Sequence, residues 1–145
     1  MQTGKTATFR PTAKQMETVA NFLPRLQAIA LQNFACVART PDGTMVLGCV
    51  EYHPTVREFV RVCYENGLVQ SFDWPGWSPT ARQYMRDSKL VASARLSTCT
   101  KLITAHIRCE RFCDCHLEVV LKSGHLQAIL RRLKQLSRGM QSRQA

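Results

Sequence analysis

The chain has 145 residues, of which 45% are hydrophobic and 21% are charged. This composition excludes a mainly disordered chain and suits one domain with its own core. No apolar run approaches the ~20 residues of a membrane helix, and the first residues lack an apolar signal region. We therefore expect a cytoplasmic protein that makes no membrane contact. The net charge of +10 favours an acidic partner, either a protein or a nucleic acid.

The expected fold class is mainly α, a compact single-domain bundle of five to seven short helices. We expect a flexible N-terminus over residues 1–11, one helical domain over residues 12–138 and a flexible basic tail over residues 139–145. Thr12 and Gln15 have the spacing of a capping box, so a first helix is expected to begin after Thr12. Its apolar residues then recur at helical spacing.

A small β-hairpin is predicted around residues 36–51, where the turn sequence Pro41-Asp42-Gly43 separates two short apolar stretches. An irregular loop is the alternative for this segment. Pro54 suits the first turn of the next helix, because the nitrogen of a first-turn proline needs no hydrogen-bond partner.

That helix is expected to stop at Gly67, since glycine is favoured just after a helix. Residues 68–77, LVQSFDWPGW, then read as an aromatic loop. Ser78 and Pro79 predict the N-cap and first residue of a following short helix.

Three more helices are predicted over residues 96–109, 114–122 and 125–138, with a break between the first two. His106 falls on the apolar face of its helix, which favours a hydrogen-bonded core histidine. Asp114 is well placed to cap the second of these helices.

The seven cysteines are an odd number in a chain without an export signal, so reduced thiols are expected. Cys109, Cys113, Cys115 and His116 are the only weak candidates for a metal site, and their C-x3-C-x-C-H spacing is not that of a zinc motif. Packing of these thiols is the favoured interpretation. A thiol nucleophile beside a histidine is a further alternative, although the pattern selects no single cysteine. No cofactor and no catalytic residue is predicted.

The final helix carries the clearest functional pattern. Its leucines recur at helical spacing, and Arg131, Lys134 and Arg138 lie on the opposite face with Arg132 at its edge. No acidic residue follows Glu118, whereas a face that meets only water usually mixes both signs of charge. These four basic residues are therefore the predicted partner-binding residues.

The motifs FDWPGW and RFCDCHL and the ending ILRRL resemble a bacterial domain family of unknown function, over roughly residues 72–133. Its members carry an F-D-W-x-x-W loop, an R-F-x-E-G-H-L segment and a closing I-L-R-R-L helix. Similar C-terminal segments occur in proteins that bear an ADP-ribose-binding macro domain, which this chain lacks. Where the family pattern has Glu-Gly, this chain has Asp114-Cys115, so we expect no positive φ at Cys115.

The resemblance implies a ligand pocket whose polar and aromatic lining comes from the aromatic loop and the segment around residue 111. Its candidate residues are Phe72, Asp73, Trp74, Trp77, Arg108, Arg111, Asp114 and His116. The aromatic residues can either stack on a base or nucleoside or plug the core, and the plug is the favoured interpretation.

The leading expectation is a non-enzymatic accessory or inhibitor-type binding protein, bacterial or from a mobile element, that docks on an acidic protein or nucleic acid. The alternative is an enzyme or ligand-binding domain linked to nucleotide or ADP-ribose chemistry through an Arg/Asp/His cluster. A concave pocket that holds those groups favours the enzyme, and a convex basic face favours the binder.

Overall fold

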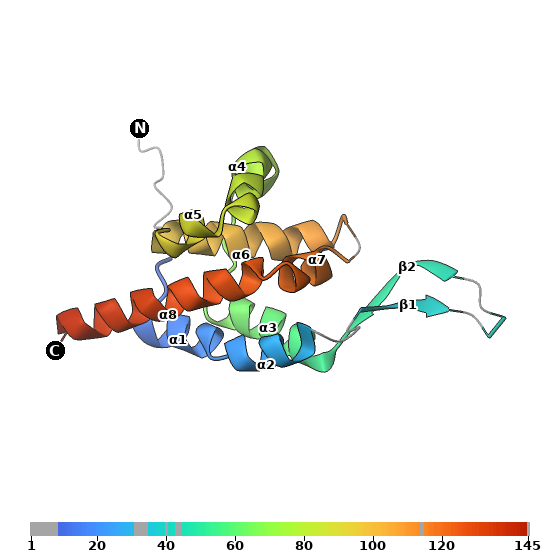
Figure 1. The fold of residues 1–145 in the computed structure, drawn as a ribbon, viewed down its shortest axis with the longest axis horizontal. Helices are drawn as coiled ribbons and strands as arrows, with labels where there is room; N and C mark the ends of the chain where they lie inside the picture. Colours follow the sequence, from blue (N-terminus) through green and yellow to red (C-terminus); the bar gives the residue numbers. More distant parts are fainter. Residues whose placement is uncertain (1–8, 31–34, 40, 43–44, 114, 145) are drawn as a thin grey trace, which may run out of the picture.

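The computed structural model describes residues 9–30, 35–39, 41–42, 45–113 and 115–144. The expected mainly helical fold is confirmed (Figure 1). Over the described residues the helices are α1 (Ala13–Ala20), α2 (Leu23–Ala30), α3 (Pro54–Glu65), α4 (Trp74–Arg86), α5 (Ser88–Ala92), α6 (Leu96–Glu110), α7 (His116–Lys122) and α8 (His125–Gln144). The strands are β1 (Ala35–Arg39) and β2 (Met45–Tyr52). This total of eight helices among the described residues includes α5, which the sequence did not predict.

The first helix begins as its sequence predicts. The Gln15 amide donates to the Thr12 hydroxyl at 3.1 Å, and the Thr12 amide donates to the Gln15 side chain at 2.9 Å. These two hydrogen bonds complete the capping box and satisfy two backbone N–H groups that a helix start otherwise leaves free. Met16 and Val19 then point into the core, so α1 packs along α8.

The predicted hairpin is present and projects away from the helices (Figure 1). Its strands are antiparallel, with Ala35 opposite Tyr52 and Val37 opposite Val50. The register shifts between Val37 and Arg39, which marks a bulge or irregularity in β1. The hairpin therefore joins the helical body at the end that carries Tyr52.

Phe9, in the N-terminal segment, contacts the end of α3. Gly67 ends α3 with a φ of +75°, as the predicted stop requires, and the ring of Phe9 occupies the space that a Cβ at Gly67 would need. The Gln70 side chain also donates to the backbone carbonyl of Phe9. These two contacts connect Phe9 to the residues that follow α3.

The predicted start of α4 was wrong. The helix begins at Trp74, because the Asp73 carboxylate accepts the Gly76 amide at 3.1 Å and Pro75 occupies the first turn. Pro79 therefore lies inside the helix, and the Ser78 hydroxyl donates to the Trp74 carbonyl at 3.3 Å. Residues 74–77 of the expected aromatic loop are therefore the first turn of a helix.

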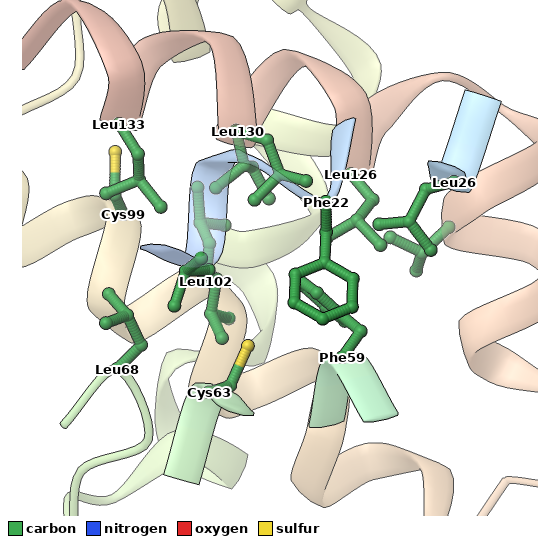
Figure 2. Close-up of a cluster of buried hydrophobic side chains, with 14 of the residues drawn as sticks. Phe22, Leu26, Phe59, Cys63, Leu68, Cys99, Leu102, Leu126, Leu130 and Leu133 are labelled. Atoms are coloured by element: carbon green, nitrogen blue, oxygen red, sulfur yellow. The ribbon is translucent and has the colours of Figure 1, made fainter. Parts of the chain in front are cut away.

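The core lies where α1, α3, α6 and α8 meet, and Figure 2 shows its central side chains. Leu102 of α6 and Leu130 and Leu133 of α8 are fully buried, together with Phe59 of α3. The predicted apolar faces of the last helices therefore form the core. The expected break after α6 is also confirmed, since the helix ends at Glu110.

The last helix is longer than predicted, because it continues beyond Arg138 to Gln144 where a flexible tail was expected. The Gln141 side chain donates to Glu17 of α1 at 3.2 Å, and Met140 packs against the core. These tertiary contacts stabilise α8 beyond residue 138, where the helical spacing of its leucines no longer predicted a helix. Among the described helices, none combines the length and apolar character needed to cross a bilayer.

Candidate functional site

The basic face of α8, defined here as Arg131, Lys134 and Arg138, points away from the core. Arg131 and Arg138 are exposed and Lys134 is half-buried, while the intervening Leu133 is fully buried. None of the three cations pairs with a carboxylate of the described residues. The structure therefore leaves their charges available to a partner.

Arg132, the fourth predicted partner-binding residue, has a different environment. Its Nε donates to the carbonyl of Ala94 at 2.7 Å, and Nη1 donates to Gln135 at 3.3 Å. The guanidinium thus ties the segment before α6 to α8. Arg132 is a tertiary anchor in this structure and is separate from the basic face.

The residues predicted to line one ligand pocket do not all come together. Phe72 and Trp77 pack edge to face at 5.9 Å, whereas Trp74 lies 5.8 Å from Phe112, near the end of α6. Asp73 caps α4, and the guanidinium of Arg108 covers the Tyr64 ring at 5.6 Å. Asp114 lies outside the described residues. The aromatic residues of the FDWPGW motif are therefore divided between two neighbourhoods.

Two cavities lie on the described surface near these residues. The N-terminal cavity has a volume of about 500 Å³ and is lined by residues 9–11, 70–72 and 95–97 together with Thr100 and Lys101. Among the predicted pocket residues, it contains Phe72.

The hairpin cavity measures about 300 Å³. It includes Tyr52, Tyr64, Glu110 and Arg111. Arg111 and Phe72, which were predicted to share one pocket, therefore line different cavities.

Three histidines form an unpredicted chain of ring contacts across α6, α7 and α8. His106 is 2% exposed, and its Nδ1 lies 3.0 Å from Nε2 of His116. Its Nε2 lies 3.0 Å from Nε2 of His125. The predicted core role of His106 is confirmed, but its partners are the two histidines that begin the next two helices.

This arrangement couples the tautomers of the three rings. A neutral imidazole has one N–H donor and one acceptor nitrogen, so His106 donates to one neighbour and accepts from the other. Burial lowers the pKa of His106 well below 6.5, and the charges of His125 and His116 lower it further. Burial also lowers the pKa of His116 and brings that of His125 to about 4. The chain is therefore neutral near pH 7, and two arrangements of its hydrogens are compatible with both contacts.

Glu110 joins the hairpin to the helices beside this chain. Its Oε2 accepts the backbone amide of His116 at 2.8 Å and that of Leu117 at 3.4 Å, and the Tyr52 hydroxyl donates to Oε1. The carboxylate thus caps α7, whose N-cap residue Cys115 makes no side-chain cap hydrogen bond.

Three of the cysteines are poor candidates for a reactive thiol. Burial raises the pKa of Cys99 to about 12 and that of Cys63 still further, which disfavours the thiolate that acts as a nucleophile. Burial and a hydrogen bond with Cys113 raise the pKa of Cys109 as well. Within the described residues, no group of histidine, cysteine and acidic side chains is arranged to hold a metal ion, so the weak metal alternative through Cys115 and His116 is not supported.

The expected backbone conformation of Cys115 was wrong. This residue has φ +69°, in the left-handed region, and it is the N-cap of α7. A turn of this kind brings the chain from the end of α6 back to α7, and glycine adopts it with the least strain. A glycine at this position would therefore relieve strain that cysteine retains.

The sequence interpretation missed the cations of the N-terminal cavity and the histidine chain. Arg10 is distant in the sequence from Arg95 and Lys101, and none of the three was a predicted site residue. His116 and His125 each begin a helix, and that shared position was the available signal for placing both rings near one end of α6. Neither grouping follows from spacing alone.

Comparison with known proteins supports membership of a family of unknown function, which is the coarser part of the resemblance. No curated protein and no solved structure shows significant similarity to this chain. Residues 11–139 match the family of unknown function DUF6508. That match spans every helix from α1 to α7 and most of α8, and it extends beyond the motif-bearing residues 72–133. The chain therefore belongs to the family of unknown function DUF6508.

Proposed function

We propose that this chain is a non-enzymatic binding protein that docks on an acidic protein or nucleic acid through the basic face of α8. The proposal rests on one observation: the cations of that face form no ion pair with a described carboxylate. Arg131, Lys134 and Arg138 have no ion pair with any described carboxylate, in a helix that contains no acidic residue.

The core supports this proposal by orienting the helix. Leu126, Ile129, Leu130 and Leu133 are buried, so the opposite side of α8 must turn outward. Seven residues separate Arg131 from Arg138, which corresponds to a ridge of about 10 Å at 1.5 Å per residue. A packed helix holds this ridge in place, so little backbone freedom is lost when a partner binds.

The charge pattern gives the second reason. Like charges three or four residues apart on a helix destabilise it by a few tenths of a kcal/mol. A partner that carries carboxylates or phosphates relieves this repulsion and forms charge-assisted hydrogen bonds with the same groups. The proposal describes a cytosolic, bacterial or mobile-element accessory protein, such as a regulator or an inhibitor of a defence system.

The alternative function, an enzyme or ligand-binding domain built on an Arg/Asp/His cluster, has less support. Phe72 and Arg111 line separate cavities, and a ring nitrogen of His116 already contacts His106. These two observations favour the binding protein over the enzyme.

The test is a pull-down from lysate of the native host at low and high ionic strength, with and without nuclease. The variant Arg131→Glu/Lys134→Glu/Arg138→Glu reverses the basic face. Its matched control, Arg57→Glu/Arg82→Glu/Arg86→Glu, makes the same charge change at exposed cations of α3 and α4. Loss of the captured partner in the α8 variant, with retention in the control, is the expected result.

The nature of the partner follows from the same experiment. A nucleic-acid partner disappears after nuclease treatment, and the α8 variant lowers the slope of log affinity against log salt by about 3, one for each phosphate contact. A protein partner survives the nuclease. Capture that is equal for the wild type and the α8 variant would show that this face is not the docking surface.

A further inference from the structure

We propose that the N-terminal cavity binds a small phosphorylated molecule that also has a planar organic part. Three segments that are distant in the sequence build it: residues 9–11, the connection before α4 and the start of α6. Its volume of about 500 Å³ falls in the range of small-ligand sites. This site is separate from the basic face of α8 and needs no residue of that face.

The charge of the lining favours an anion. Arg10, Arg95 and Lys101 all contribute to the cavity, and no acidic residue lines it. None of these three cations forms an ion pair within the described part of the chain. Cations gathered around one hollow repel one another, and a phosphate dianion placed between them removes that repulsion. Arginine binds phosphate oxygens with two parallel N–H groups, which gives the site its geometry.

The polar groups of the cavity are mostly donors. The hydroxyls of Ser71 and Ser97 have no hydrogen-bond partner among the described residues, whereas the Thr100 hydroxyl already donates to the Ser97 carbonyl at 2.8 Å. Arg95 is the N-cap of α6 and makes no side-chain cap hydrogen bond. The first amides of this 15-residue helix therefore keep donor capacity at its positive end.

The aromatic wall indicates the rest of the ligand. The rings of Phe9 and Phe72 line the cavity, and the Lys101 ammonium lies 5.8 Å from the Phe72 ring centre. A planar organic group can pack against such a ring while its phosphate reaches the cations, as aromatic stacking tolerates any planar base. A phosphate ester of a planar molecule fits this lining better than inorganic phosphate, which would leave the aromatic wall uncovered.

The fluorescence of Trp77 can report ligand binding directly, because the Lys101 ammonium of the cavity lies 5.9 Å from the Trp77 ring centre. The variant Trp74→Phe leaves Trp77 as the single tryptophan of the chain. Its fluorescence is titrated with adenosine 5′-monophosphate and with inorganic pyrophosphate, while adenosine and potassium chloride at matched ionic strength serve as controls. Saturable changes with the two phosphate compounds at or below about 1 mM, and none with adenosine or chloride, are expected.

Cavity variants then locate the site. Arg95→Gln and Lys101→Gln each weaken binding of adenosine 5′-monophosphate by roughly tenfold or more, since hydrogen bonds to charged groups contribute about 1.5–3 kcal/mol. Arg82→Gln and Arg86→Gln, exposed cations of α4 outside the cavity, leave the affinity unchanged. Calorimetric titration repeats the comparison without a fluorophore, and thermal unfolding verifies that every variant is folded.

Two results would overturn the proposal. One is the absence of saturable binding of both phosphate compounds up to about 1 mM, by fluorescence and by calorimetry. The other is an equal loss of affinity in the cavity variants and the α4 controls, which would indicate general attraction to a basic protein. Neither result bears on the docking of a macromolecule to α8, so the two proposals fail independently.

Discussion

Cys115 has a strained backbone conformation in the connection between α6 and α7. The chain leaves α6 at Glu110 and must turn before α7 begins at His116. The turn places Cys115 at φ +69°, where a side chain with a Cβ is less stable than glycine by about 1–2 kcal/mol. A cysteine persists there because the flanking helices are anchored in the core through Leu102 and Leu117, which impose the turn.

Replacing Cys115 by glycine should therefore stabilise the protein. We expect Cys115→Gly to raise the free energy of unfolding by about 0.5–1 kcal/mol, because relief of the left-handed strain exceeds the extra freedom of glycine in the unfolded chain. Urea denaturation of both proteins measures the difference. Cys115→Ala removes the thiol and keeps the strain, so it should give no such gain; an equal gain with alanine would assign the effect to the sulfur.

At the scale of elements, Glu110 matters more than its position at a helix end suggests. Its carboxylate binds the first amides of α7 and the hydroxyl of Tyr52, so one side chain links α6, α7 and β2. A short helix such as α7 is not stable on its own, and its first N–H groups need acceptors. The capping group of α7 comes from the previous helix, α6. A residue beside the helix start normally supplies such a cap.

Removing this carboxylate should loosen α7 and the base of the hairpin together. We expect Glu110→Ala to lower the free energy of unfolding by about 2 kcal/mol, because partly buried amides lose a charged acceptor. Glu110→Gln keeps an acceptor oxygen and should lose less than half as much. Glu65→Ala breaks only the exposed ion pair with Arg61 and should cost at most about 0.5 kcal/mol. Equal losses in Glu110→Ala and Glu65→Ala would refute the capping role.

At the scale of the whole molecule, the histidine chain ties three helices into one packed unit. His106 lies inside α6, and its two neighbours stand at the first residues of α7 and α8. Burial lowers the pKa of all three below the unfolded value of 6.5. Below pH 6.5 the unfolded chain thus binds more protons than the folded chain, and stability falls as the pH falls.

The stability of the protein should consequently decrease between pH 6.5 and about pH 4, the pKa of His125. Each histidine that stays neutral only in the folded state contributes a slope of about 1.4 kcal/mol per pH unit. Urea denaturation at several pH values measures that slope. His125→Gln should reduce it, because one of the three buried neutral rings is removed. A flat profile in the wild type over this range would contradict the burial of neutral histidines.

The sequence by itself determined the features that depend on residues close together along the chain. Thr12 with Gln15 predicted the first cap, Gly67 predicted the end of α3, and the leucine spacing of α8 predicted which face is buried, because capping and amphipathic patterns act within a few residues. The start of α4 was misjudged because Asp73 and Ser78 are both acceptable N-cap residues, and each is followed by a proline within the next two positions.

Only the tertiary structure decided which distant residues meet. It separated Phe72 from Arg111, joined His106 to His116 and His125, and gathered Arg10 with Arg95 and Lys101 around one cavity. These groupings depend on how whole helices pack, and packing is set by the shapes of many buried side chains acting together. A local pattern shows which way a helix faces, but the partner that it faces is determined by the assembled core.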